Sequence, residues 1–193
     1  MKVYSGFTEE TAQSLLLDAG AFFKNYDMEE DTFETAVAAG KLLGATKDGG
    51  EFSAKPEIRQ VAVDGVKGKA KGLEVLDSWD VYLKANVLEI KKETIQSALC
   101  SAKAEVKEDY TEITANNSIG LSDYIDNITW VGTLSGSDKP VVIQVYNALN
   151  TDGLTLSTKD KDNSVLAMTF YGHYTQNDLN TPPFKIYYPT IAE

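Results

Sequence analysis

The sequence of 193 residues contains one cysteine, Cys100, and one histidine, His173. A single cysteine excludes an internal disulfide and any zinc site made of several cysteines. A Ser-His-Asp triad would have to use His173, and the sequence places no serine and aspartate close to it. A hydrolase that uses His173 is therefore the weakest functional hypothesis, and we expect a packed or interface histidine. We predict no enzyme activity, no metal site and no cofactor.

Long hydrophobic runs are also absent. No run approaches the roughly 18 apolar residues of a membrane span. The first residues, MKVYSGFTEETAQ, lack the apolar region of a secretory signal. We therefore expect a protein that is made in the cytoplasm and has no membrane partner.

Positive charge is scarce in this chain. Eighteen lysines and arginines face 29 aspartates and glutamates, which gives a formal net charge of -11. Tight binding to nucleic acid needs clustered lysine and arginine side chains. The charge balance therefore argues against general attraction to DNA, although not against a protein through which DNA passes without being held.

What the sequence does contain is the pattern of β-strands. The clearest strand covers residues 79–90, where alternate positions are apolar and would face a core: Val81, Leu83, Ala85 and Val87. We expect further strands at 58–63, 110–116, 128–134, 141–148, 163–174 and 184–188, and a buried strand at 15–23. One short amphipathic helix is expected at about residues 92–102. The predicted fold is mainly β, an antiparallel β-barrel or sandwich in a single domain of residues 1–193.

Residues 25–56 are expected to form a long loop or arm. Their first part is acidic with weak periodicity, and Asp48-Gly49-Gly50 has the composition of a hairpin turn. Loops of this length in a compact domain are usually functional or disordered. We therefore consider this segment a possible contact between subunits.

Residues 55–72, KPEIRQVAVDGVKGKAKG, interleave lysines with glycines, as a phosphate-binding loop would. A Walker-type loop needs GxxxxGK[ST] between a strand and a helix. Here the serine or threonine is missing, and the next predicted element is a strand. We therefore expect a glycine-rich hairpin connection with solvated lysines. A carbohydrate-binding β-sandwich that exposes Trp79, Trp130 and tyrosines remains an alternative function.

Several segments resemble tail tube (major tail) proteins of bacteriophages. Residues 40–99 have a Gly-Ala-Thr-x-x-Gly-Gly turn, a Pro-Glu-x-Arg strand and an Asp-Gly-x-x-Gly-x-x-Lys-Gly hairpin, followed by a long strand and a short helix. The matching positions are Gly44, Gly49, Gly50, Pro56, Glu57, Arg59, Asp64, Gly65, Gly68, Lys71 and Gly72. The segments DNITWVGTLSG, VVIQVYNALNTDGLTLSTKDK, LAMTFYGHY and PPFKIYYP, and LLLDAGAFFKNYD near the start, are similar to the same proteins.

This resemblance implies a structural virion protein, encoded by a phage or a prophage, that assembles into stacked hexameric rings. The implied partners are other copies of the chain, a tape-measure protein, tail terminator and baseplate or initiator proteins, and a sheath protein if the tail contracts. DNA would pass through the tube during ejection without specific binding. The implied location is the phage tail, after synthesis in the cytoplasm of the host bacterium.

Two sets of residues are expected to serve such an assembly. Subunit contacts are expected at Lys67, Lys69, Lys71, Arg59, Glu57 and Asp48. The lysines would meet the acidic surface of a neighbouring copy. The tube lumen is expected to be lined by one alternating set of strand residues, such as Asp80, Tyr82, Lys84 and Asn86, or by the set at 141–147. An acidic lumen would repel phosphates and let a duplex pass.

Overall fold

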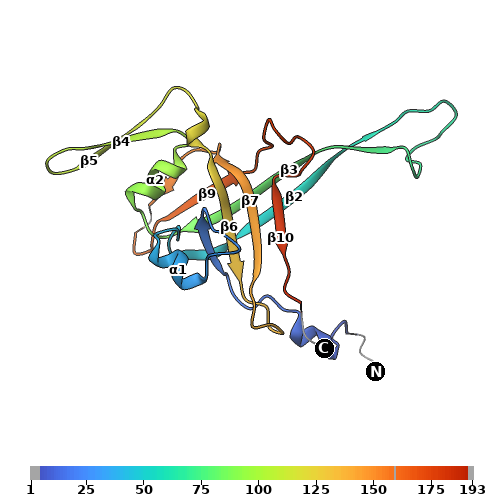
Figure 1. Cartoon of the computed structure of the whole chain (residues 1–193), viewed down its shortest axis with the longest axis horizontal. Coiled ribbons are helices and arrows are strands. Elements are labelled where there is room, and N and C mark those ends of the chain that lie inside the picture. The colour runs from blue at the N-terminus through green and yellow to red at the C-terminus, as the bar shows by residue number, and fades with distance from the viewer. Residues whose placement is uncertain (1–4, 159, 191–193) are drawn as a thin grey trace.

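The computed structural model describes residues 5–158 and 160–190. Ten strands and four short helical segments follow one another along this part of the chain (Figure 1). In chain order they are η1 Glu9–Gln13, β1 Ala21–Lys24, α1 Phe33–Ala38, β2 Thr46–Gln60, β3 Glu74–Val87, α2 Lys92–Ala98, β4 Ala102–Val106, β5 Thr111–Ala115, η2 Leu121–Asp123, β6 Ile125–Gly132, β7 Val141–Asn150, β8 Leu156–Ser157, β9 Val165–Tyr171 and β10 Phe184–Tyr187.

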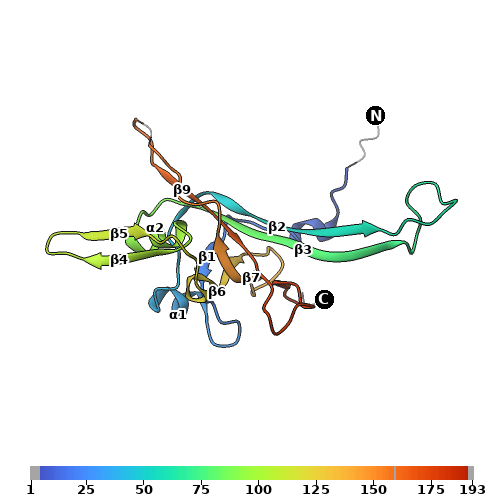
Figure 2. The same cartoon turned by 90° about the horizontal axis from the view of Figure 1, so that it is seen from above.

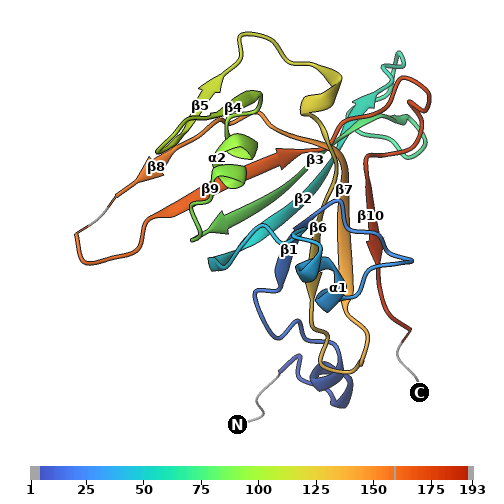
Figure 3. The same ribbon diagram turned by 60° about the vertical axis from the view of Figure 1, so that its left-hand side comes forward.

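Eight of the strands form one antiparallel sheet that bends between β7 and β9. The order is β1-β6-β7-β9-β3-β2, with β10 also paired to β7 and β8 to β9. Only the end of β7 pairs with β9, at Leu149 and Asn150, so the two halves fold toward each other as the layers of a sandwich (Figure 3). In the described residues β1 and β2 remain the two ends of the sheet. The mainly β prediction is confirmed as a sandwich, and the closed barrel is wrong.

The main core lies between these two layers. Phe22, Ile128 and Val145 from one half pack with buried side chains of β3 and β9 from the other: Val81, Leu83, Ala85, Val87, Leu166, Met168 and Phe170. The alternation predicted for residues 79–90 is therefore confirmed, because its apolar set is the buried set. The strand itself is longer than predicted and begins at Glu74.

The helix expected at 92–102 is confirmed at α2 but ends at Ala98. Cys100 has a positive φ of 66°, which breaks the helical path, and Ala102 already begins β4. Ala98 is fully buried against the main core. Within the described residues no helix is long and apolar enough to cross a membrane.

The long loop or arm expected at 25–56 is a loop only in part, and its role as a contact between subunits stays a prediction. The segment holds α1, which buries Ala36 beside Phe23, and then most of β2. The expected turn at Asp48-Gly49-Gly50 is a bulge inside β2: Thr46 pairs with Val87 and Gly50 with Ala85. Strand β2 therefore has two more residues here than β3. Asp48 and Gly49 have positive φ values, which accommodate the bulge and let the strand continue.

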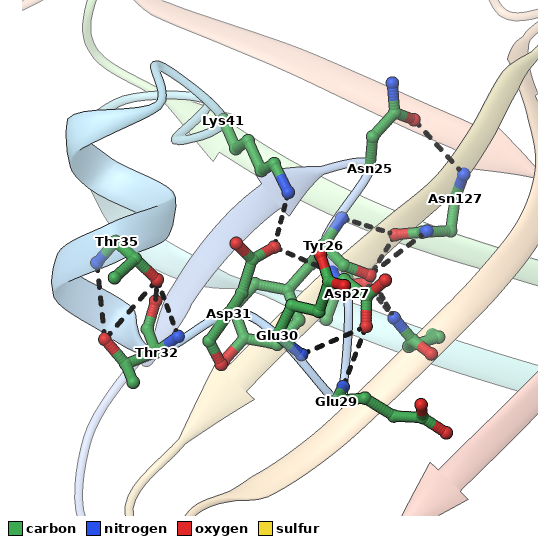
Figure 4. Close-up of polar contacts among 12 residues, drawn as sticks. Asn25, Tyr26, Asp27, Glu29, Glu30, Asp31, Thr32, Thr35, Lys41 and Asn127 are labelled. Atoms are coloured by element: carbon green, nitrogen blue, oxygen red, sulfur yellow. Dashed lines mark hydrogen bonds and ion pairs between the residues drawn. The ribbon is translucent and has the colours of Figure 1, made fainter.

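Two acidic residues of this segment, Asp27 and Asp31, are engaged within the fold, as Figure 4 shows. Asp27 accepts hydrogen bonds from the backbone N–H groups of Glu29 and Glu30, and Asp31 accepts from the N–H of Asp27 and pairs with Lys41. Thr32 caps α1 through the N–H of Thr35. These local bonds turn a polar stretch into an ordered connection.

The buried strand expected at 15–23 is only partly right. Phe22 and Phe23 are buried on β1, but the side chains of Leu15, Leu16 and Leu17 are 47%, 56% and 61% exposed. The backbone of this stretch pairs with residues 133–135, with Leu16 opposite Leu134. In the part of the chain that the structure describes, no second layer covers these leucines, and they lie on the surface.

Candidate assembly surface

Strands β2 and β3 continue beyond the sandwich as a two-stranded ribbon. Strand β9 pairs with β3 only from Tyr82 to Val87, and among the described strands β2 is the one neighbour of residues 74–78. We call residues 56–78 the hairpin arm. It extends away from the body in both Figure 1 and Figure 2, and the β4–β5 hairpin extends in the opposite direction.

One face of the hairpin arm is a continuation of the core. Along β2 and β3 the pairs that point inward are Phe52 with Leu83, Ala54 with Val81, Pro56 with Trp79 and Ile58 with Leu76. Trp79 is the last member that the body covers, through an edge contact with Phe184 at 5.6 Å between ring centroids. Beyond it, Ile58 and Leu76 are 56% and 52% exposed. Beyond Trp79, the apolar face of the hairpin arm is therefore exposed to solvent.

The opposite face of the hairpin arm is polar. Arg59 forms a two-point ion pair with Asp77, at 3.1 Å and 3.3 Å, and Glu57 lies on the same face two residues earlier. Both side chains of this ion pair are about half exposed, so the pair stabilises the arm by at most about 1 kcal/mol. The polar face alone gives the arm little stability.

Three lysines lie at the tip of the hairpin arm. Lys67, Lys69 and Lys71 are exposed, and the one ion pair of the tip joins Lys69 to Glu74 at 3.9 Å. The amide of Gln60 donates to the carbonyl of Gly68 at 2.7 Å and closes the tip. A strand follows, as predicted, so no helix N-terminus is available to hold a phosphate.

The structure therefore brings five of the six expected contact residues onto one element. Lys67, Lys69, Lys71, Arg59 and Glu57 all belong to the hairpin arm. Asp48 does not, because it lies in the bulge at the other end of β2, where the neighbouring Gly49 approaches Ala19. The apolar pair Ile58 and Leu76 is a feature that the sequence alone did not reveal.

The expected lumen residues share the polar face of β3. Asp80, Tyr82, Lys84 and Asn86 alternate with the buried set, and Lys55 lies opposite Asp80 and Glu51 opposite Lys84. Opposite charges thus face each other across the strands, and the face is balanced in charge rather than acidic. The Tyr82 hydroxyl donates to Glu51, and this hydrogen bond raises the pKa of Tyr82.

The residues named for other functions are engaged in packing. Trp130 is held by a hydrogen bond from its ring to the carbonyl of Ala19 at 2.9 Å, and both it and Trp79 pack against the core. His173 bonds the Asn147 carbonyl through Nδ1 at 2.9 Å and packs against Tyr124. These contacts favour neither a sugar platform nor a hydrolase.

No family model and no curated protein matches this chain. The likeness to tail tube proteins in the sequence motifs therefore remains a prediction.

Proposed function

We propose that the chain is a structural subunit that assembles with its own copies into stacked rings, as a tail tube protein of a bacteriophage does. The observation that carries this proposal is the uncovered core face of the hairpin arm. Together with the motif order in residues 40–99, it supports self-assembly over binding of a small ligand or catalysis.

The energetics of the hairpin arm support a partner for it. A lone two-stranded hairpin is marginally stable in water, whereas a third strand or a packed layer makes it stable. Ile58 and Leu76 present an apolar surface that is about half exposed in the monomer. Complete burial of an exposed side chain of this size contributes about 1.5–3 kcal/mol, so covering the exposed half of one of them contributes about 1 kcal/mol. In an assembly of identical chains, a neighbouring copy is always present and can cover this surface.

In the proposed assembly, six copies form each ring, and the hairpin arm joins neighbouring copies. The polar face with Asp80, Tyr82, Lys84 and Asn86 is the proposed lining of the lumen. A lining of balanced charge gives a DNA duplex neither a strong attraction nor a strong barrier. The proposed partners are the tape-measure protein inside the tube, the terminator and baseplate proteins at its ends, and a sheath where the tail contracts.

Electron microscopy of the purified chain at high concentration tests the proposal directly. We expect rings or tubes from the wild type. The triple variant Lys67→Glu, Lys69→Glu and Lys71→Glu should remain a folded monomer, because these side chains touch no core residue, but should form few or no tubes. The matched control is Lys103→Glu with Lys107→Glu on the β4–β5 hairpin. A wild-type chain that stays monomeric, even with a tape-measure partner, would contradict the proposed function.

A further inference from the structure

A groove of about 450 Å³ opens on the body between residues 16–22 and the start of β2. Its apolar lining comes from both layers of the sandwich: Leu16, Phe22, Phe52, Leu83, Trp130 and Ile143. The exposed leucines at 15–17 extend this apolar surface along one rim. The groove therefore offers an apolar side chain a place to bury.

The charged side chains that face this groove are acidic. Asp18, Asp48 and Glu51 belong to its lining, and no lysine, arginine or histidine does. The Glu51 side chain lies on the other face of β2, with Tyr82 and opposite Lys84, so Asp18 and Asp48 supply the charge of the groove. Asp18 accepts a hydrogen bond from the N–H of Gly20 at 3.0 Å, and Glu51 accepts one from Tyr82. In the described part of the chain none of these carboxylates forms an ion pair. An occupant with apolar and cationic groups fits this chemistry.

The tip of the hairpin arm has that chemistry. Its exposed apolar side chains are Val61, Val63 and Val66, and its cations are Lys67, Lys69 and Lys71. We propose that the arm tip of one copy binds the groove at Leu16 and Asp48 of a second copy. This inference rests on the proposed self-assembly and names the two surfaces that meet.

A chain cannot place its own arm tip in its own groove. From Gly50, at the groove, β2 runs in continuous pairing with β3 to Gln60, where the tip begins. Ten residues of strand span about 33 Å, and the paired ribbon points away from the body (Figure 2). The contact is therefore between copies. Because tip and groove are different surfaces, it is heterologous, and repetition gives a ring or a filament.

A disulfide test distinguishes this contact from other modes of assembly. In a Cys100→Ser background, a copy carrying Lys69→Cys is mixed with a copy carrying Leu16→Cys and oxidised. The matched control replaces Lys69→Cys by Lys107→Cys, an exposed lysine of the β4–β5 hairpin. We expect a cross-linked dimer from the first mixture in several-fold excess over the control, as resolved by denaturing electrophoresis.

Neutralising the groove gives an independent measurement. Asp18→Asn and Asp48→Asn keep the hydrogen-bond acceptors and remove the charge. The concentration needed for assembly should rise about fivefold, as two exposed charge pairs predict. The control with Glu105→Gln and Glu112→Gln should assemble like the wild type.

The outcomes separate this inference from the proposed function. Normal tubes with no excess of cross-linking over the control, or with an unchanged assembly concentration in the neutral groove variant, overturn the groove contact and leave the tube intact. Excess cross-linking in a chain that forms no rings or tubes supports the contact and overturns the tube.

Discussion

At the scale of single residues, the acidic connection before α1 depends on Asp31. Its carboxylate accepts from the N–H of Asp27 and pairs with Lys41, and these two contacts lower the pKa of Asp31, the backbone hydrogen bond contributing most. Such partners stabilise the ionised form of the carboxyl group in the folded chain, and the unfolded chain lacks them. The charge of Asp31 therefore stabilises the fold at neutral pH.

The variant Asp31→Asn tests this through its pH dependence. Because the folded pKa is lowered, the stabilisation is complete above the unfolded value of about 3.9 and disappears as the pH falls through the folded value. We expect the variant to melt below the wild type at pH 7 and the two melting temperatures to converge below about pH 4. The control is Glu29→Gln, whose side chain has no partner drawn in Figure 4. A difference that persists unchanged to pH 3 would contradict the electrostatic origin.

At the scale of elements, the hairpin arm and the body differ in how much apolar burial stabilises them. Body strands bury Leu83, Met168 and Phe170 completely, whereas Ile58 and Leu76 on the arm stay more than half exposed. The stability of the isolated chain is therefore concentrated in the sandwich. The arm adds surface for assembly rather than stability to the monomer.

Replacing residues 57–78 by Asn-Gly tests this division. The new turn connects Pro56 and Trp79, which are paired opposite each other, and Asn-Gly favours a two-residue hairpin. We expect the free energy of unfolding to change by less than about 1 kcal/mol, while Met168→Ala in the core should cost about 2–5 kcal/mol. Chemical denaturation measures both. A shortened chain that no longer folds would show that the arm is part of the core.

The same elements show how far the sequence could predict the fold. Residues 79–87 were correctly predicted as a strand because apolar, buried residues alternate with polar residues on the other face. This period of two can be recognised in the sequence. The hairpin connection was predicted, but residues 74–78 were missed as strand because Asp77 is an extra residue in β3: Leu76 and Trp79 share a face although their spacing is odd. Such a bulge hides the alternation, and only the pairing with β2 reveals it.

The candidate contact surface was predictable in part. Its lysines were visible as a cluster of positive charge in an acidic chain. The groove was not visible, because it joins residues near 16, 50, 83, 130 and 143 that only the folded sandwich brings together. The segment 25–56 is more ordered than expected, because its polar side chains bond to one another locally and the composition alone does not show this.

At the scale of the whole molecule, charge sets the conditions for assembly. Copies with a formal charge of -11 repel each other at long range. The three lysines of the arm tip are a local exception and would orient an approaching copy. Exposed charges of this kind act over about 10 Å in 0.1 M salt and about 3 Å in 1 M salt.

Assembly of the wild type should therefore depend on salt through these lysines. Salt also screens the general repulsion between copies, so the lysines are tested by comparing the wild type with the variant Lys67→Gln, Lys69→Gln and Lys71→Gln. We expect the initial rate of the wild type, followed by light scattering, to exceed that of the variant at 0.1 M NaCl. The ratio of the two rates should fall toward one at 1 M NaCl, because salt screens the attraction between arm tip and groove that only the wild type has. If both proteins respond to salt alike, the lysines do not form the contact that directs assembly.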